Sequence, residues 1–355
     1  MSTLQNYAAW LKEPHARLVV DEAPLYEPAE GEVLVKIHAV SIQPVDWKVQ
    51  TFNYSIKEYP LKYPYILGTY SAGVVEAVGA GVTHVKKGDR ILGYHVTMAT
   101  QRPREGSFQH YAILRADLVS ALPPTLSFEN AAVLPLGLAT AADALYQTDH
   151  LALPLPKPEA PNHEGKEKVL LVWGASSSVG SAAVQLAVAS GLRVVATASP
   201  ANFDFVKSLG ASAVFDYRSS TIVKDLVAEL QMQNEEFAGV FDAISEHGSS
   251  ELCAEVASKV KGGNKFVVGT LAMPEVLPEG VKATYAMSPN VALKNGGALA
   301  RAIYHDFVPR ALETGALKCK PDPLLVEGKG LGVLQKAVDR AKEGVSARKV
   351  VARIN

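Results

Sequence analysis

The chain has 355 residues, of which 48% are hydrophobic and 20% charged, and its formal net charge is −1. This composition is typical of a globular protein too long for one simple core, so we expect two domains. The interspersed charges exclude the basic footprint of a nucleic-acid binder, and no apolar run approaches the roughly 20 residues of a membrane helix. The two cysteines, Cys253 and Cys319, are too few for a four-cysteine zinc site, and a reducing, cytoplasmic location is the simplest expectation.

The first third of the chain has the pattern of a β-rich domain. Runs of β-branched residues between glycine and proline turns predict strands at 31–42, 71–79, 89–96 and 107–114. Residues 131–147 have a helical pattern. The proline-rich, polar segment 151–166 that follows predicts a loop.

The second half alternates apolar strands with amphipathic helices, which defines the fold class as α/β. Strands are predicted at 168–174, 193–199, 213–217, 239–245 and 264–270. This alternation predicts a parallel sheet with helices on both faces. After a helix at 330–344, the last strand, 349–355, has no partner in such a sheet, so we expect it to return to the first domain.

A glycine-containing turn joins the first strand of this half to its helix, in the stretch VLLVWGASSSVGSAAVQLAVASG (169–191). The free amides at a helix start would hold a pyrophosphate, as in dinucleotide-binding folds. Of the three glycines in the usual fingerprint only Gly180 is kept, and Ala175 and Ser177 replace the others. The alternative is that Gly174 and Gly180 only permit close helix packing in a domain that binds no nucleotide.

The end of the second strand favours NADPH over NADH. Folds that bind NAD usually place a carboxylate there for the ribose 2′-hydroxyl, whereas this chain has Ser199 and Asn202. Ser199 can donate a hydrogen bond to a 2′-phosphate, and Tyr217, followed by the basic Arg218, ends the next strand at the same edge. The alternative for Ser199 is a plain N-cap of the following helix.

The order of segments resembles the medium-chain dehydrogenase/reductase superfamily over nearly the whole chain. The resemblance rests on AVSIQPVDWK (39–48), the glycine-rich run 66–91, the segment 106–114 and the nucleotide-binding half. The motif VDWK, the stretch 199–219 and the closing GVSARKVVARI resemble the zinc-free fungal branch of trans-acting enoyl reductases and ToxD-like oxidoreductases. The resemblance to this superfamily implies a GroES-like β-rich catalytic domain, residues 1–133 and 305–355, and a Rossmann-type doubly wound parallel sheet, residues 134–304.

The resemblance also implies the reaction. It indicates an NADPH-dependent reduction of the C=C bond of an α,β-unsaturated carbonyl, on a small-molecule or carrier-bound enoyl substrate, with a polyketide synthase as partner and with no nucleic acid or membrane. The protein would be a monomer or homodimer. The alternatives are a quinone or enone reductase that needs no carrier, and a catalytically silent nucleotide-binding protein that acts through interaction.

No metal is expected in the site. Zinc alcohol dehydrogenases of the superfamily carry a Cys near the position of Gln43 and a His-Glu pair where this chain has Thr69 and Tyr70. Since Thr is not a plausible zinc ligand, the donor set of those enzymes is missing here.

Three residues are candidates for catalysis. The resemblance places Lys48 near the cofactor, where its ammonium would stabilise an enolate or contact the ribose, unless it is a surface lysine beside Trp47. Thr140 matches a hydroxyl beside the nicotinamide, the alternative being a helix threonine bonded to its own backbone. Tyr54 matches the tyrosine proposed as proton donor in mitochondrial-type enoyl reductases, the alternative being a loop tyrosine that lines an apolar pocket.

The remaining expectations concern cofactor contacts and two polar side chains. Asp46 is expected to orient loop backbone or Lys48 and to stay ionised beside that cation. His95 is expected to be solvent-facing or locally bonded rather than catalytic. The predicted cofactor-binding residues are Val45, Asp46, Trp47, Lys48, Ser176, Ser177, Ser178, Val179, Ser199, Pro200, Ala201, Asn202, Tyr217, Val268, Gly269, Val345 and Ser346.

Overall fold

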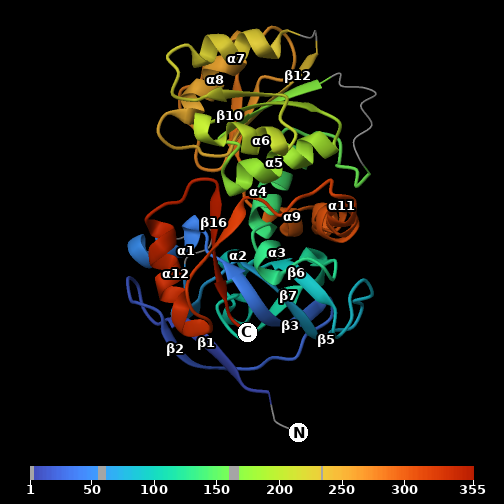
Figure 1. Cartoon of the computed structure of the whole chain (residues 1–355), viewed down its shortest axis with the longest axis vertical. Coiled ribbons are helices and arrows are strands. Elements are labelled where there is room, and N and C mark those ends of the chain that lie inside the picture. The colour runs from blue at the N-terminus through green and yellow to red at the C-terminus, as the bar shows by residue number, and fades with distance from the viewer. Residues whose placement is uncertain (1–3, 55–60, 160–167, 233–234) are drawn as a thin grey trace. The chain divides into compact units, whose positions relative to one another are not determined.

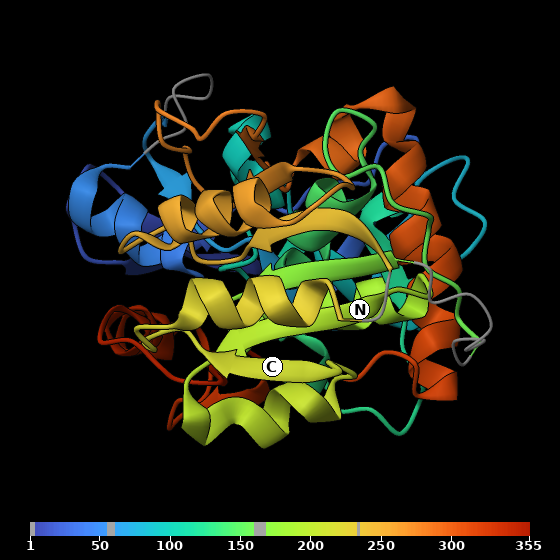
Figure 2. The same cartoon turned by 90° about the horizontal axis from the view of Figure 1, so that it is seen from above.

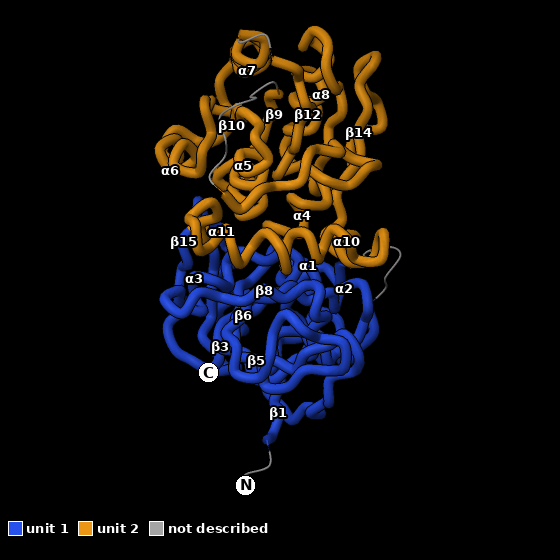
Figure 3. Tube along the Cα trace, turned by 90° about the vertical axis from the view of Figure 1, so that its right-hand side faces the viewer, with its two compact units in different colours: residues 1–136, 322–355 blue, residues 137–321 orange. Residues whose placement is uncertain are grey.

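The computed structural model describes residues 4–54, 61–159, 168–232 and 235–355, and the chain divides into two compact units (Figures 1 and 3). Unit 1 comprises residues 1–136 and 322–355, and unit 2 comprises residues 137–321. The second boundary differs from the expected one, because residues 305–321 group with unit 2. In that segment the backbone amide of Lys318 donates to the side-chain oxygen of Gln185 at 2.7 Å, which ties it to the nucleotide-binding half.

Unit 1 is built on two β-sheets within the residues that the structure describes. Its strands are β1 (Asn6–Leu11), β2 (Val19–Ala23), β3 (Glu32–Ser41), β4 (Tyr65–Ile66), β5 (Tyr70–Val78), β6 (Arg90–Tyr94), β7 (Tyr111–Arg115), β8 (Val119–Ala121), β15 (Asp322–Leu325) and β16 (Arg348–Arg353). The larger sheet has the order β15-β16-β3-β5-β6-β8, with β7 also paired to β3, and the smaller has the order β2-β1-β4. Most residues of β3 and the first residues of β5 are buried, which is consistent with the β-branched runs from which these strands were predicted.

Two of the strand predictions in unit 1 have outcomes that matter for the site. The last strand does return to this unit, since β16 pairs antiparallel with β3 and Val351 lies opposite Ser41. That prediction is confirmed. The predicted strand 107–114 begins only at Tyr111, because Phe108 instead accepts a backbone hydrogen bond from Ala9 of the smaller sheet, at 2.8 Å.

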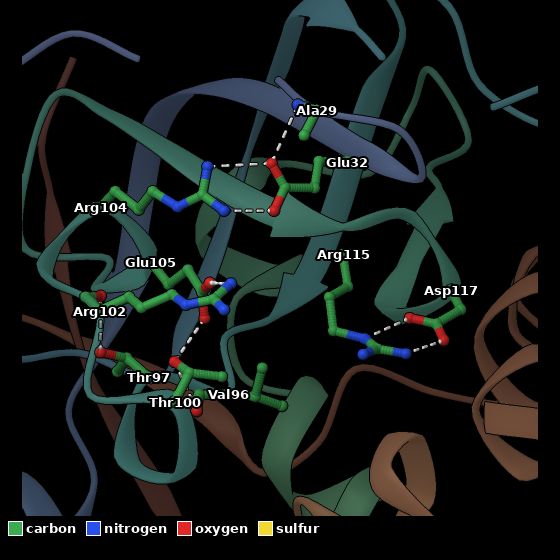
Figure 4. Close-up of polar contacts among 10 residues, drawn as sticks. All are labelled: Ala29, Glu32, Val96, Thr97, Thr100, Arg102, Arg104, Glu105, Arg115 and Asp117. Carbon is green, nitrogen blue, oxygen red and sulfur yellow. Dashed lines mark hydrogen bonds and ion pairs between the residues drawn. The ribbon is translucent and has the colours of Figure 1, made fainter. Parts of the chain in front are cut away.

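Short helices and a network of ion pairs complete unit 1. The helices are α1 (Pro44–Phe52), α2 (Thr97–Thr100), α3 (Phe128–Ala131) and α12 (Leu334–Lys342). Figure 4 shows how Arg104 forms a bidentate pair with Glu32, at 2.5 and 3.1 Å, beside a neighbouring cluster in which the Glu105 carboxylate accepts from Thr100 at 2.6 Å. These contacts fix the turn that contains Glu105, whose carbonyl oxygen is used in the site described below.

Unit 2 contains a parallel six-stranded sheet, as the alternating pattern predicted (Figures 1 and 2). Its strands are β9 (Lys168–Trp173), β10 (Arg193–Ala198), β11 (Ala213–Asp216), β12 (Glu236–Asp242), β13 (Phe266–Gly269) and β14 (Lys282–Tyr285). They are arranged in the order β11-β10-β9-β12-β13-β14. The order reverses between β9 and β12, which is the switch point where open α/β sheets bind their ligands.

Unit 2 also contains helices. They are α4 (Pro135–Tyr146), α5 (Ser178–Ala189), α6 (Phe203–Ser208), α7 (Ile222–Leu230), α8 (Ser249–Lys259), α9 (Asn290–Leu293), α10 (Ala298–Ala300), a π-helix (Arg301–Phe307) and α11 (Val308–Thr314). Of these, α5 to α8 pack on the sheet of this unit and bury its apolar side chains. Fully buried side chains such as Leu171, Leu226 and Phe237 form the core between α7, α8 and the sheet. The residues that end the strands therefore stand on a rigid edge.

Candidate functional site

The turn between β9 and α5 is tight and well supported. Gly174 has φ +74°, a conformation that favours glycine, and its backbone amide donates to the Thr197 hydroxyl at 3.0 Å. Ser177 caps α5, since its hydroxyl accepts from the amide of Gly180 at 3.0 Å. A Cβ on Gly180 would lie 2.3 Å from the carbonyl oxygen of Gly174, so only glycine permits this close approach.

The start of α5 fits the pyrophosphate of a dinucleotide. The hydroxyl oxygen of Ser178 is buried and has no hydrogen-bond partner among the described residues. It stands in the first turn of a 12-residue helix, where free amides and the helix dipole attract an anion. Ser176, Ser177, Ser178 and Val179 form this turn and the start of α5, and their contact with a cofactor stays a prediction.

Helix α4 packs closely against this turn. A Cβ on Gly137 would lie 2.7 Å from the carbonyl oxygen of Ser178, so the first turn of α4 touches the first turn of α5. Thr140 follows one turn later on α4 and is buried. The structure therefore brings Thr140 into the same unit as the phosphate turn, and its contact with the nicotinamide stays a prediction.

The carboxyl ends of β10 and β11 lie side by side, because Ala198 pairs with Asp216 in the parallel register. Ser199 and Tyr217 immediately follow these two residues and reach the same edge. The expected alternative for Ser199 is wrong, since a 3₁₀ turn, Pro200–Asn202, separates it from α6 and its side chain makes no cap hydrogen bond. Its hydroxyl instead accepts from the Asn202 side chain at 3.1 Å.

The side chains beside Ser199 include one carboxylate that the sequence analysis did not consider. Asp216 ends β11, and Arg218 pairs with it at 3.0 Å, which offsets its charge. Arg218 also lies 5.5 Å from the centre of the Tyr217 ring, whose side chain is 42% exposed. The edge consequently offers the hydroxyl of Ser199, the amide of Asn202 and the phenol of Tyr217. The carboxylate of Asp216 beside them is paired with Arg218.

The loop after β12 is organised by a buried carboxylate that the sequence analysis missed. Asp242 accepts from the backbone amides of Ile244 and Ser245, both at 3.0 Å, and from the hydroxyls of Ser249 and Ser250, at 2.7 and 2.9 Å. An acidic residue that ends an apolar parallel strand and precedes several serines is a signal that could have revealed it. It fixes the loop at the carboxyl edge of the sheet.

The predicted residues Val268 and Gly269 lie beside this loop. Gly269 pairs with Asp242 across the sheet, and a Cβ on Gly269 would lie 2.6 Å from the Ser245 hydroxyl. That hydroxyl also accepts from the amide of Thr270 at 2.8 Å, so the loops after β12 and β13 are joined. A cavity of about 240 Å³ opens here, lined by residues 245–248, 250–251 and 272–274.

In unit 1 the predicted residues 45–48 form the first turns of α1. The backbone amide of Gln43, the N-cap, donates to the carboxylate of Asp46 at 2.8 Å, and the amide of Gly68 donates to the same carboxylate at 3.2 Å. Asp46 thus orients loop backbone, as expected. Its charge partner, however, is Lys349 rather than Lys48, and burial raises the pKa of the Asp46 carboxyl to about 6.

Lys349 is a buried lysine at the start of α1 that the sequence analysis did not find. Its ammonium is buried, donates to the side-chain oxygen of Gln43 and lies 5.9 Å from the centre of the Tyr70 ring. Burial lowers the pKa of Lys349 to about 7, and the neighbouring Asp46 charge opposes that shift. No local pattern could have revealed it, because Lys349 and Gln43 lie far apart in the sequence.

The other predicted residues of unit 1 are more exposed. Lys48 is half-buried, with its ammonium 5.7 Å from the centre of the Trp47 ring, a contact that either interpretation of Lys48 allows. Tyr54 is 40% exposed and borders residues 55–60, which lie outside the described part of the chain. Val345 and Ser346 lie in the exposed loop that leads to β16.

The centre of unit 1 also contains a neutral histidine. His95 is buried, its Nδ1 lies 2.8 Å from the carbonyl oxygen of Glu105, and its Nε2 lies 2.7 Å from the Ser71 hydroxyl. Since a carbonyl only accepts, Nδ1 carries the proton and Nε2 accepts from Ser71. Burial lowers the pKa of His95 to about 4, so the ring is uncharged near neutral pH. His95 is locally bonded, as expected.

Comparison with known proteins identifies the family. The model of the alcohol dehydrogenase GroES-like domain matches residues 29–124, and that of the zinc-binding dehydrogenase matches residues 178–302. The zinc-binding alcohol dehydrogenase domain-containing protein cipB of Emericella nidulans is 43% identical over 352 residues, which cover 99% of this chain and 98% of that protein. The chain belongs to the medium-chain dehydrogenase/reductase superfamily.

The relatives and structural neighbours are consistent with this dehydrogenase/reductase family. The trans-enoyl reductase himH of Aspergillus japonicus is 38% identical, over 100% of this chain and 99% of that protein. The CurK enoyl reductase structure matches with a TM-score of 0.70 at 20% identity, over 99% of this chain and 100% of that one, which supports the fold. Membership confirms the resemblance and indicates a nicotinamide cofactor. None of the helices in the described residues is long and apolar enough to span a membrane.

Proposed function

We propose that this protein is a zinc-independent enoyl reductase that uses NADPH to reduce the C=C bond of an α,β-unsaturated carbonyl, with the substrate carried by a polyketide synthase. The environment of Lys349 carries the zinc-free part of the proposal, because its buried ammonium contacts Gln43 and lies 5.9 Å from the centre of the Tyr70 ring. Relatives named trans-enoyl reductases, himH and tndF, support the reaction class and the partner.

Zinc does not fit the residues of unit 1. The oxygen of Gln43 is engaged by the Lys349 ammonium, and the two oxygens of Asp46 accept backbone amides. Thr69 and Tyr70 offer neutral hydroxyl groups where zinc relatives carry an imidazole and a carboxylate. A dication placed here would be repelled by a resident cation. Among the residues that the structure describes, no group of three or more His, Cys, Asp or Glu side chains could hold a metal ion. The reaction is therefore proposed to proceed without Lewis-acid assistance.

The preference for NADPH is supported by the edge formed by β10 and β11. Ser199 and Asn202 follow β10 where folds that bind NAD usually place a carboxylate. The last residue of β11, Asp216, is acidic, and Arg218 pairs with it. A 2′-phosphate at this edge would meet hydrogen-bond donors and no unpaired negative charge on these strand ends. Pro200 and Ala201 complete the turn around Ser199.

The chain's own groups would bind the cofactor, orient the substrate and stabilise the negative charge that develops on the substrate oxygen. When bound, the cofactor supplies the hydride. The turn at Ser176–Val179 would hold its pyrophosphate, and Val268 and Gly269 at the end of β13 would flank the nicotinamide, with the Thr140 hydroxyl on its carboxamide. Lys48 would donate a hydrogen bond to the substrate oxygen as negative charge develops there, and Tyr54 would supply a proton. Val45, Trp47, Val345 and Ser346 remain proposed cofactor contacts.

The test is consumption of NADPH, followed in parallel with an enoyl thioester of pantetheine, a simple enone and a quinone. We expect turnover of the thioester, and a preference of tens-fold for a carrier-bound thioester, because binding energy from the carrier is used for positioning. Lys48→Met should lower kcat/KM by about 10- to 100-fold. The matched control, Lys62→Met, removes an exposed lysine and should leave kcat/KM unchanged.

The same assay separates the alternatives. Turnover of the quinone or enone alone would favour a reductase without a carrier partner. Tight NADPH binding with no turnover of any substrate would favour the catalytically silent protein. Stoichiometric zinc in the purified active enzyme, or equal affinity for NADH and NADPH, would contradict the corresponding part of the proposal.

A further inference from the structure

Lys349 lies beside the N-terminus of α1 because of strand pairing. β16 and β3 are antiparallel, with Val351 opposite Ser41, and the amide of Ile42 donates to the carbonyl oxygen of Val350 at 2.9 Å. The same register continued by two residues places Lys349 next to Gln43, whose side-chain oxygen accepts from the ammonium. The chain's last strand thereby contacts the cap of the helix that carries Lys48.

The carboxylate of Asp46 joins a third segment to this contact. It accepts from the amide of Gln43 at the helix start and from the amide of Gly68, just before β5. The titratable and aromatic groups that face the pair are Tyr70, whose ring lies 5.9 Å from the ammonium, and Tyr65, whose hydroxyl is bonded to Thr97 at 3.0 Å. Burial raises the pKa of Tyr65, so this phenol stays neutral.

Burying these two ionisable side chains is unfavourable for the stability of the fold. Asp46 is 1% exposed and Lys349 is 6% exposed, and burial shifts the pKa of each toward its uncharged form. Taking two charges out of water commonly costs more than their mutual attraction returns, so an apolar pair of similar volume would usually stabilise the fold as well or better. Costly buried charges are concentrated at functional sites. The pair is therefore explained by what it positions.

We propose that Lys349, acting through Gln43 and Asp46, is a positioning residue that holds the first turn of α1 and so sets the place of Lys48 for the reduction. The role of Lys48 rests on the proposed function, whereas the hold on α1 does not. Gln43 and Asp46 form the capping box of the helix, so its start depends on the residue that the ammonium contacts and on the carboxylate whose charge attracts it. Loss of the ammonium would free the Gln43 side chain and leave the Asp46 charge buried without its cation.

The experiment compares Lys349→Met, the double variant Asp46→Asn/Lys349→Met and the full-length wild type. Hydrogen exchange is measured on peptides that cover α1 and, as an internal reference, β6. Urea unfolding and steady-state kinetics with NADPH and the enoyl thioester are measured on the same preparations. The matched control is Glu255→Gln/Lys259→Met, which removes an exposed ion pair from α8.

We expect α1 amides to exchange at least tenfold faster in both Lys349 variants while those of β6 are unchanged. The double variant should lose less stability than Lys349→Met, because it leaves no buried charge without a cation, although its new amide nitrogen faces one of the two backbone amides that Asp46 accepts. Its kcat should be at least tenfold lower than that of wild type, with little change in KM. The control pair should alter none of these values. If the two residues served stability alone, kcat would fall only in variants that unfold at a lower urea concentration, and only in proportion to that loss.

Two results would overturn the inference. The first is a double variant with wild-type kcat and wild-type exchange in α1, and the second is a double variant whose loss of kcat only accompanies global destabilisation. Failure of the proposed function is distinguishable, because wild type would then turn over no enoyl substrate. The exchange of α1 would still report whether Lys349 holds the helix.

Discussion

Replacing Gly180 by Ala tests the phosphate turn directly. The added Cβ would lie 2.3 Å from the carbonyl oxygen of Gly174 and 2.7 Å from the Cα of Ala175. Carbon and its neighbours prefer separations of about 3.5 Å, so the start of α5 must move by about 1 Å from the end of β9. Both obstructing atoms belong to the backbone, which means that no side chain can turn away to make room.

The size of the effect follows from two terms of opposite sign. Overpacking of this kind costs about 1–3 kcal/mol, while Ala in place of Gly inside a helix returns about 1 kcal/mol. We expect a net loss of up to about 2 kcal/mol in the free energy of unfolding. Misplacing one charge-assisted amide contact with the pyrophosphate costs about 1.5–3 kcal/mol, so the Kd for NADPH should rise by about 10- to 100-fold.

The assay is fluorescence titration with NADPH together with urea unfolding. Gly191→Ala is the matched control, since it makes the same substitution just after the other end of α5, with φ +85° and no atom within 4 Å of the new Cβ. That variant should lose about 1–2 kcal/mol of stability from backbone strain alone and bind NADPH normally. If Gly180→Ala binds NADPH within twofold of wild type, our interpretation of the turn as the pyrophosphate site is refuted.

Three further predictions concern the coenzyme edge, the loop after β12 and the buried histidine. Ser199→Asp places a carboxylate after β10 and should shift the ratio of NADPH to NADH affinity by at least about tenfold toward NADH, as judged from both Kd values; an unchanged ratio would disprove the assignment of this edge. Asp242→Asn puts an amide donor among four donors and should cost about 3 kcal/mol in urea unfolding, because charge-assisted hydrogen bonds of about 1.5–3 kcal/mol are lost; a loss below about 1 kcal/mol would show that the loop is held otherwise. The pKa of His95 is about 4 in the folded protein, below its ordinary 6.5, so between these values the unfolded chain binds more protons and stability falls as pH falls. His95→Gln should remove up to about 3 kcal/mol of this acid dependence, measured as the change in unfolding free energy between neutral pH and pH near 4, and an unchanged slope would argue against a buried neutral ring.

The parts of the fold that were predicted have strong local patterns. The parallel sheet follows from apolar runs such as that of β9, each followed by an amphipathic helix, and the phosphate turn from its place between them. The strands β1 and β2 were not predicted. β2 is almost wholly exposed and shows no alternation, so its residues carry little hydrophobic signal. β1 pairs with β2, a few residues further along, and with the distant β4.

The residues of the candidate site were likewise predicted where a local pattern specifies them and missed where a distant partner does. Residues that act through backbone geometry, such as Ser177 and Gly180, were identified because the turn and the cap are made by residues three apart. Residues that act through a distant partner were missed. Asp46 was expected to orient Lys48, its neighbour in the chain, whereas the lysine whose charge lowers the pKa of Asp46 in the folded protein is Lys349.

The sequence by itself determined the fold class, the family and the position of the cofactor turn, because these depend on periodicity and on spacings within one strand, turn and helix. Only the tertiary structure decided which charges are buried and which groups they face. The pairing of β16 with β3 brings Lys349 to Gln43, and the joining of the loops after β12 and β13 brings Ser245 to Thr270. Such contacts depend on strand register between segments far apart in the chain, and no local pattern specifies that register.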